Sequence, residues 1–134
     1  MSDIGIEVRM QEPYEAALAR VQEALKAEGF GVLTRIDVHD AFREKLGVEF
    51  RRYCILGACN PPLAHKALSS RPDVGMMLPC NVTVEDDGEG ASIVRIVNAE
   101  AMMQAASLER DPVLAEIGRE AGERLNRVAL ALGA

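Results

Sequence analysis

Aromatic and basic side chains are scarce in this sequence. Phe, Trp and Tyr make up 4% of its 134 residues, and 15 Lys and Arg against 21 Asp and Glu leave a net charge of −6. Proteins that bind nucleic acids gain much of their affinity from basic side chains on phosphates, and many stack bases on aromatic rings. We therefore expect no nucleic-acid partner.

Long apolar runs are missing as well. None approaches the roughly 18 residues that a membrane-spanning helix needs. Residues 1–5 carry neither the basic segment nor the apolar segment of an export signal. The three cysteines are an odd number and cannot form a complete disulfide framework. These observations predict no membrane association and a reducing, cytoplasmic location with free thiols.

The sequence does contain enough apolar material for one core. Apolar residues account for 49% of the chain, and its length suits a single domain over residues 1–134. Alternating apolar residues predict strands, and apolar residues at helical spacing predict helices. The predicted strands cover residues 4–10, 30–38, part of 48–58, 76–85 and 91–97. The predicted helices begin at Pro13, Asp40, Pro61, Ala99 and Asp111, and the last one spans about 111–132.

These elements follow the order β-α-β-β-β-β-α, with short helices inserted. An early β-α-β unit followed by a hairpin indicates an α+β fold, in which a mixed sheet has its helices packed on one face. Gly29 is expected to end the first helix in a left-handed conformation, and Asn60 to cap the helix that follows it. Gly118 and Gly122 weaken the last helix, so we expect them to allow close packing, on the chain's own sheet or at a dimer interface.

Several short motifs occur in order along the chain. They are Glu28-Gly29-Phe30-Gly31-Val32-Leu33, Ile36-Asp37, Gly57-Ala58-Cys59-Asn60-Pro61-Pro62-Leu63-Ala64-His65 and Leu78-Pro79-Cys80-Asn81-Val82. Through these motifs the chain resembles, from about Ile4 to Met103, the domain of unknown function family 302, in the branch with Cys before Asn at both sites. The resemblance implies a β-α-β(4)-α fold, a prokaryotic distribution and a homodimer. It implies no activity, because none is established for the family.

Two Cys-Asn pairs lie at or near predicted strand ends, and their cysteines are the first candidates for chemistry. Cys59 precedes the helix cap Asn60, and the partial positive charge of a helix N-terminus stabilises a thiolate. A cysteine so placed can act as a nucleophile or bind a soft metal. Cys80 lies near the start of another predicted strand, so the two thiols could be close if these strands are neighbours. The alternative is that both are small buried hydrophobic residues, the usual role of free cysteine.

His65 and the two asparagines complete the candidate site. With Cys59 and Cys80, His65 would make a three-ligand set suited to zinc or copper. Its position near the polar side of its helix equally suits a solvated histidine. Asn60 and Asn81 are expected to satisfy backbone N–H groups. An anion at the helix cap is the alternative, which the two following prolines disfavour because they supply no N–H.

Three functions agree with this pattern. The leading hypothesis is a small-molecule or soft-metal binding domain, with its site at Cys59, Asn60, His65, Cys80 and Asn81. The second is a thiol-dependent redox enzyme or sulfur carrier, with Cys59 as nucleophile and Cys80 as resolving or assisting thiol. The third is a structural dimerisation module. The sequence lacks a Gly-rich phosphate loop, a Gly-x-Ser-x-Gly elbow and a His-Glu-x-x-His motif, so it assigns no cofactor or reaction.

Overall fold

The structure is a computed structural model that describes residues 4–134. Residues 1–3, part of the segment expected to lack an export signal, lie outside it. Its strands are β1 (Gly5–Met10), β2 (Gly31–Asp37), β3 (Tyr53–Cys59), β4 (Cys80–Asp86) and β5 (Ser92–Val97). Its helices are α1 (Tyr14–Ala27), α2 (Val38–Leu46), α3 (Pro61–Ser70), α4 (Ala99–Ala105) and α5 (Pro112–Ala131), with the 3-10 helices η1 (Pro72–Met77) and η2 (Leu108–Arg110).

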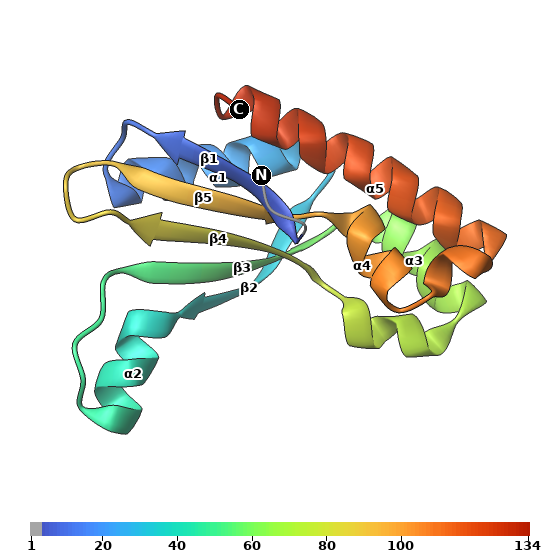
Figure 1. Cartoon of the computed structure of the whole chain (residues 1–134), viewed down its shortest axis with the longest axis horizontal. Coiled ribbons are helices and arrows are strands. Elements are labelled where there is room, and N and C mark those ends of the chain that lie inside the picture. Colours follow the sequence, from blue (N-terminus) through green and yellow to red (C-terminus); the bar gives the residue numbers. More distant parts are fainter. Residues whose placement is uncertain (1–3) are drawn as a thin grey trace.

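The strands form one sheet in the order β1-β5-β4-β3-β2. The α+β fold and the element order are as predicted, but the sheet is antiparallel throughout rather than mixed. Strands β1 and β2 run in the same direction but lie at opposite edges of the sheet (Figure 1). The predicted β-α-β unit therefore spans the whole sheet through α1. The later strands fill the space between them, and the hairpin that joins β4 to β5 favours antiparallel pairing.

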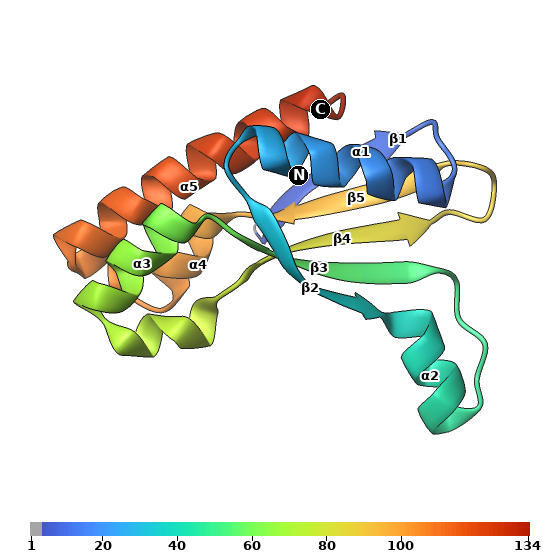
Figure 2. The same cartoon turned by 180° about the vertical axis from the view of Figure 1, so that it is seen from behind.

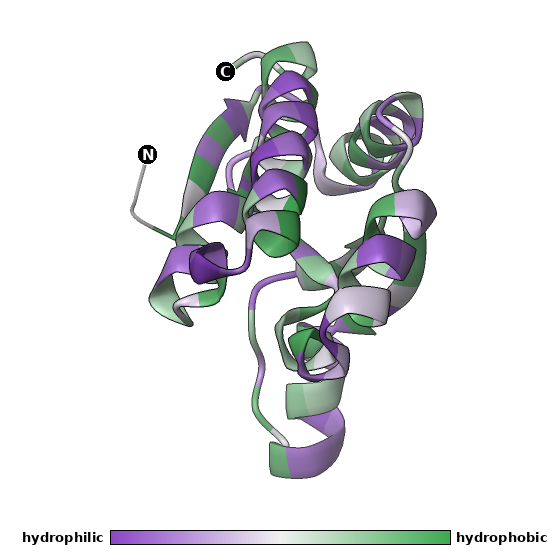
Figure 3. Cartoon of the chain, turned by 90° about the vertical axis from the view of Figure 1, so that its right-hand side faces the viewer, coloured by the Kyte–Doolittle hydropathy of each residue, from purple (hydrophilic) through white to green (hydrophobic). Residues whose placement is uncertain are grey.

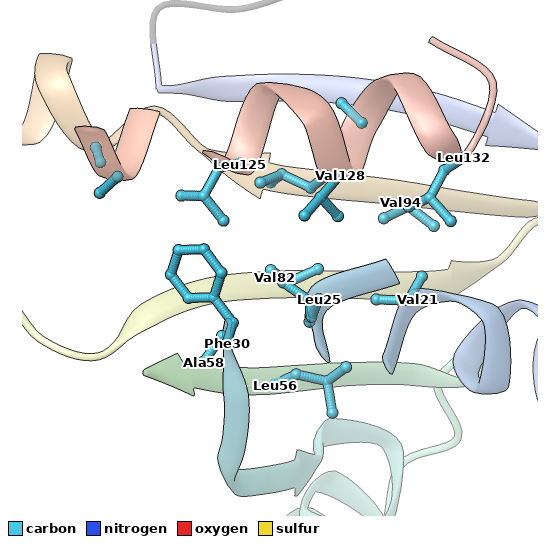
Figure 4. Packing of buried hydrophobic residues seen from close by; sticks show 14 of the residues in the cluster. Val21, Leu25, Phe30, Leu56, Ala58, Val82, Val94, Leu125, Val128 and Leu132 are labelled. Atoms are coloured by element: carbon cyan, nitrogen blue, oxygen red, sulfur yellow. The ribbon is translucent and has the colours of Figure 1, made fainter. Parts of the chain in front are cut away.

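Helices α1 and α5 pack on the same face of the sheet, as predicted (Figures 1 and 2). Side chains of α5 point toward the strands, with Leu125 and Val128 above Val82 and Val94 (Figure 4). The whole predicted stripe of this helix is buried, namely Leu114, Ile117, Ala121, Leu125, Val128 and Leu132. Burial of a side chain as large as Leu or Val stabilises the fold by roughly 1.5–3 kcal/mol. This stripe therefore fixes α5 on the sheet.

The ends of α1 and α3 follow from single residues. Gly29 has a φ of +84°, and the N–H of Phe30 donates to the carbonyl of Leu25 at 2.9 Å. This is the left-handed cap expected after α1. The side chain of Asn60 accepts a hydrogen bond from the N–H of Leu63 at 3.3 Å and so caps α3. Both caps were predicted, and both lie next to the candidate site.

Two strand boundaries differ from the prediction. The strand expected from residue 76 begins only at Cys80, because residues 72–77 form η1. The segment η1 packs on α3 with Val74 buried, and an alternating pattern alone cannot distinguish this from a strand in the sheet. Strand β3 includes Cys59 itself. Both cysteines of the motifs therefore belong to strands.

The two glycines of α5 pack on α4, not on the sheet. A Cβ atom at Gly118 would lie 3.0 Å from Cγ of Met103, and one at Gly122 would lie 3.4 Å from Oε1 of Glu100. The small residues therefore let α4 approach α5 closely. This corrects the expectation that they pack on the chain's own sheet.

Helices α3 and α4 and the segment η1 gather at one end of the sheet. Strands β3 and β5 end there, and β2 and β4 begin there (Figures 1 and 2). Figure 3 looks onto this end and shows hydrophilic and hydrophobic residues on the same helices. Within residues 4–134 no helix combines the length and hydropathy needed to cross a bilayer.

Candidate functional site

A cavity of about 490 Å³ opens at the end of the sheet where α3, η1 and α4 gather. Sites for small molecules typically measure roughly 300–1,000 Å³. The strands contribute Leu33, Thr34, Ala58, Cys59, Cys80, Asn81 and Val97 to its wall, and Phe30 lies just before β2. The helices and the segment before β4 contribute Asn60, Leu63, Ala64, Ala67, Leu68, Gly75, Met76, Met77, Leu78, Pro79, Ala99, Met102, Met103, Ile117 and Ala121. The cavity is therefore built from segments far apart in the sequence.

The two Cys-Asn motifs meet in this cavity. Cys59, Asn60, Cys80 and Asn81 all line it. Strands β3 and β4 are antiparallel neighbours, and Ala58 near the end of β3 pairs with Cys80 at the start of β4. The end of one motif therefore lies beside the start of the other. The sequence left this adjacency open, because it does not reveal the strand order.

His65 does not join them. It lies on the exposed side of α3 and outside the cavity wall. The reason is helical geometry, because Leu63 and Ala67 occupy the buried side of α3. Among residues 4–134 no three His, Cys, Asp or Glu side chains are grouped to hold a metal. The expected ligand set of Cys59, Cys80 and His65 is therefore not assembled.

Burial governs the chemistry of the thiols. It raises the pKa of Cys80 to about 11, with a smaller contribution from the nearby Cys59. Cys80 is therefore protonated at neutral pH, which disfavours it as an assisting thiolate. Cys54 is fully buried in the core, as predicted, and burial raises its pKa too. All three cysteines are free.

Asn60 supports the backbone, as expected. It is 8% exposed, and besides capping α3 it packs against the turn after α1. A Cβ atom at Gly29 would lie 3.0 Å from Nδ2 of Asn60, so this glycine is required both by its φ and by the close contact. Asn81 is exposed in β4, where it pairs with Gly57. Asn81 is thus the more accessible amide at the cavity.

Sequence reasoning gave no role to Gly57, the residue of β3 that begins the Gly57-Ala58-Cys59-Asn60 motif. A Cβ atom there would lie 2.1 Å from Oγ1 of Thr34 and 2.7 Å from Cγ of Pro79. Thr34 and Pro79 therefore close over β3 at a point where only a glycine leaves room. The Gly-Ala-Cys-Asn and Pro-Cys-Asn motifs fit together through this contact.

The methionines of the cavity were missed too. Met76, Met77, Met102 and Met103 line it. They form two Met-Met pairs in the sequence, and this repetition is the signal that could have found them. Met103 is buried, whereas Met76 is 90% exposed at the rim.

The cavity is apolar and uncharged. Of the residues that the structure describes, no charged side chain lines it, and its polar groups are Thr34, the two asparagines and the two thiols. Three of its residues, Leu33, Leu68 and Met76, are also exposed hydrophobic residues. An ion with a full charge would find no opposite charge here. The site suits an uncharged ligand with a large apolar surface.

A second cavity of about 580 Å³ lies on the face of the sheet opposite α1 and α5. It shares Asn81, Val97 and Met102 with the first cavity. Charged side chains line it, including Glu7 and Arg95, whose Oε1 and Nε lie 2.9 Å apart. The two cavities thus adjoin but differ in charge.

Beside this second cavity lies the buried carboxylate of Glu85, which is 6% exposed. It accepts hydrogen bonds from Arg95 at 2.7 Å and from Arg51. Burial alone would raise the pKa of Glu85, but its bonds to the two guanidinium groups outweigh burial and lower it. The charges on this face therefore stabilise one another.

Comparisons with known proteins agree with the fold. The family model described as Domain of unknown function DUF302 matches residues 6–132. A crystal structure of an uncharacterized conserved protein DUF302 from Bacillus stearothermophilus has 28% sequence identity and a TM-score of 0.84. The similarity covers 98% of this chain and 99% of that one. A search of curated proteins found no match.

Proposed function

We propose that this chain, which belongs to the DUF302 family, binds an uncharged, largely apolar small molecule in the cavity between its two Cys-Asn motifs. The observation that carries the proposal is a cavity of about 490 Å³ with apolar walls and a few polar groups. Such a composition is typical of small-molecule sites, where polar groups fix the orientation and apolar walls supply affinity. In this arrangement Asn81 and Cys59 contact the polar part of the ligand.

The test uses N-phenyl-1-naphthylamine, an uncharged fluorescent probe that brightens in apolar surroundings. Ala64 lines the cavity and is half-buried, so Ala64→Phe fills space without removing a contact. The matched control is Ala24→Phe, at a half-buried alanine of α1 outside the cavity. We expect the wild type and the control to bind the probe with similar affinity and Ala64→Phe to bind it at least about tenfold more weakly. Equal binding by all three proteins would refute the proposal.

The role of the thiols is tested separately by thermal-shift screening of uncharged metabolites. The wild type is compared with the double variant Cys59→Ser/Cys80→Ser. Stabilisation by a compound that is lost in the double variant would place the thiols in contact with it. Stabilisation that is unchanged would leave binding to the apolar walls and to Asn81.

A second proposal concerns assembly: the protein acts as a homodimer in the prokaryotic cytoplasm. Three free thiols suit a reducing compartment. The sheet face opposite α1 and α5 carries isoleucines from neighbouring strands, with Ile36 paired with Ile55 and 50% exposed. Sedimentation of Ile36→Lys should give a monomer where the wild type gives a dimer. The control Leu46→Lys, at a 68% exposed position on α2, should stay dimeric.

A further inference from the structure

The apolar cavity and the second cavity share one wall. Asn81, Val97 and Met102 line both of them. Beyond this wall the second cavity, of about 580 Å³, lies on the face of the sheet opposite α1 and α5. A molecule whose apolar part fills the first cavity therefore has space for a polar part in the second. Ile36, the residue proposed for the dimer contact, lines neither cavity.

Three uncharged polar side chains line the second cavity without hydrogen-bond partners. Within the part of the chain that the structure describes, the amide of Asn81 and the hydroxyls of Thr83 and Tyr53 make no hydrogen bond. Asn81 and Thr83 are two residues apart on β4, so their side chains lie on the same face of the sheet. Tyr53 shares this face, because it pairs with Glu85, two residues beyond Thr83. Because Oγ1 of Thr83 is buried without a partner, a polar occupant is favoured beside it.

The charged side chains at the second cavity, by contrast, are already paired. Nε of Arg95 lies 2.9 Å from Oε1 of Glu7, and Arg95 also donates to Glu85 at 2.7 Å. Arg51 donates to Glu85 as well, so two carboxylates face two guanidinium groups. An ionic group in this cavity would compete with one of these pairs, whereas an uncharged group leaves them intact. The second cavity therefore favours a part of a ligand that is uncharged and rich in hydrogen-bonding groups.

We infer that the ligand is an uncharged amphiphile, with an alkyl chain in the apolar cavity and a polyhydroxyl head, such as a sugar ring, in the second cavity. This inference rests on the function proposed above and specifies the class of its ligand. Each hydroxyl of such a head both donates and accepts hydrogen bonds, which matches the free amide of Asn81 and the free hydroxyl of Tyr53. The C–H groups of a sugar ring pack on apolar side chains, and Val97 and Met102 provide these at the shared wall.

The experiment measures how well two compounds with the same alkyl chain displace N-phenyl-1-naphthylamine from the protein. They are octyl β-glucoside, which has a sugar head, and 1-octanol, which has a single hydroxyl, so the ratio of their inhibition constants isolates the contribution of the head. With the glucoside kept below the concentration at which it forms micelles, we expect the wild type to bind it at least about tenfold more tightly than octanol. The double variant Asn81→Leu/Tyr53→Phe should reduce this ratio to about one, because it removes both hydrogen-bonding groups.

The matched control is Tyr14→Phe, which also removes a tyrosine hydroxyl but at a residue that lines neither cavity, and it should keep the wild-type ratio. Equal binding of the glucoside and octanol by the wild type would overturn the inference, as would a wild-type ratio that survives in the double variant. Circular dichroism of each variant separates loss of binding from loss of folding. If the naphthylamine probe binds and the ratio in the wild type is about one, only this inference fails. If the probe does not bind the wild type, the proposed function fails and this inference fails with it.

Discussion

Gly57→Ala should destabilise the protein more than any other single methyl group added to the sheet near the cavity. Its Cβ would lie 2.1 Å from Oγ1 of Thr34 and 2.7 Å from Cγ of Pro79, and neither is a flexible side-chain end. Overpacking of this kind lowers the free energy of unfolding by about 1–3 kcal/mol. For a chain of this length that corresponds to a fall in Tm of about 4–12 °C. Thermal and urea unfolding followed by circular dichroism measure the effect.

The matched control is Gly31→Ala, also in the sheet, where no atom lies within 4 Å of the added Cβ. It should change stability by less than about 0.5 kcal/mol or raise it slightly. A second control removes the clashing oxygen. Thr34→Ala should restore part of the loss in a double-mutant cycle, since Cβ of Thr34 lies at an ordinary 3.5 Å. If Gly57→Ala is as stable as Gly31→Ala, the account of how the two motifs fit together is wrong.

Three further predictions follow from the site and its surroundings. Glu85→Gln should lower the free energy of unfolding by about 1–3 kcal/mol at pH 7, because it removes the negative charge to which two arginines donate hydrogen bonds. The folded-state pKa of Glu85 is lowered, so its contribution is present above the ordinary value of 4.5 and disappears as the pH falls through the folded pKa. Urea unfolding of both proteins from pH 7 to pH 3 should therefore show a shrinking difference, and a constant difference would contradict the ion pairing. Asn60→Ala should lower stability by about 1 kcal/mol through loss of the α3 cap, and an unchanged urea midpoint would exclude the cap. Cys80 should react with iodoacetamide slowly at pH 8 and faster as the pH approaches about 11, and mass spectrometry showing rapid labelling at pH 7 would refute its burial.

Local structure was largely predictable from the sequence. The cap at Asn60, the left-handed Gly29 and the buried stripe of α5 depend on neighbours within a few residues, and each was predicted correctly. The position of Cys54 in the core followed from strand alternation. The β-α-β(4)-α order that the family resemblance implied agrees with the five strands of the sheet. Features of this kind need no knowledge of which strands pair.

Features that depend on strand order were not predictable. The early β-α-β unit suggested neighbouring parallel strands, but three later strands separate β1 from β2. The environment of Gly118 depended on the position of α4. The grouping of four methionines required η1 and α4 to line the same cavity. Each of these is a long-range contact, for which a local pattern holds no information.

The two Cys-Asn motifs therefore contain two kinds of residue. Gly57, Asn60 and Pro79 hold neighbouring segments in place. Gly57 leaves room for the ring of Pro79, and Asn60 caps α3. Cys59 and Cys80 are not required for this, since a small apolar residue would pack as well at either position. If the cysteines only filled space, replacing both by alanine would leave stability nearly unchanged and would affect no ligand. If the proposed ligand contacts Cys59 at the cavity wall, the same double variant should bind that ligand more weakly.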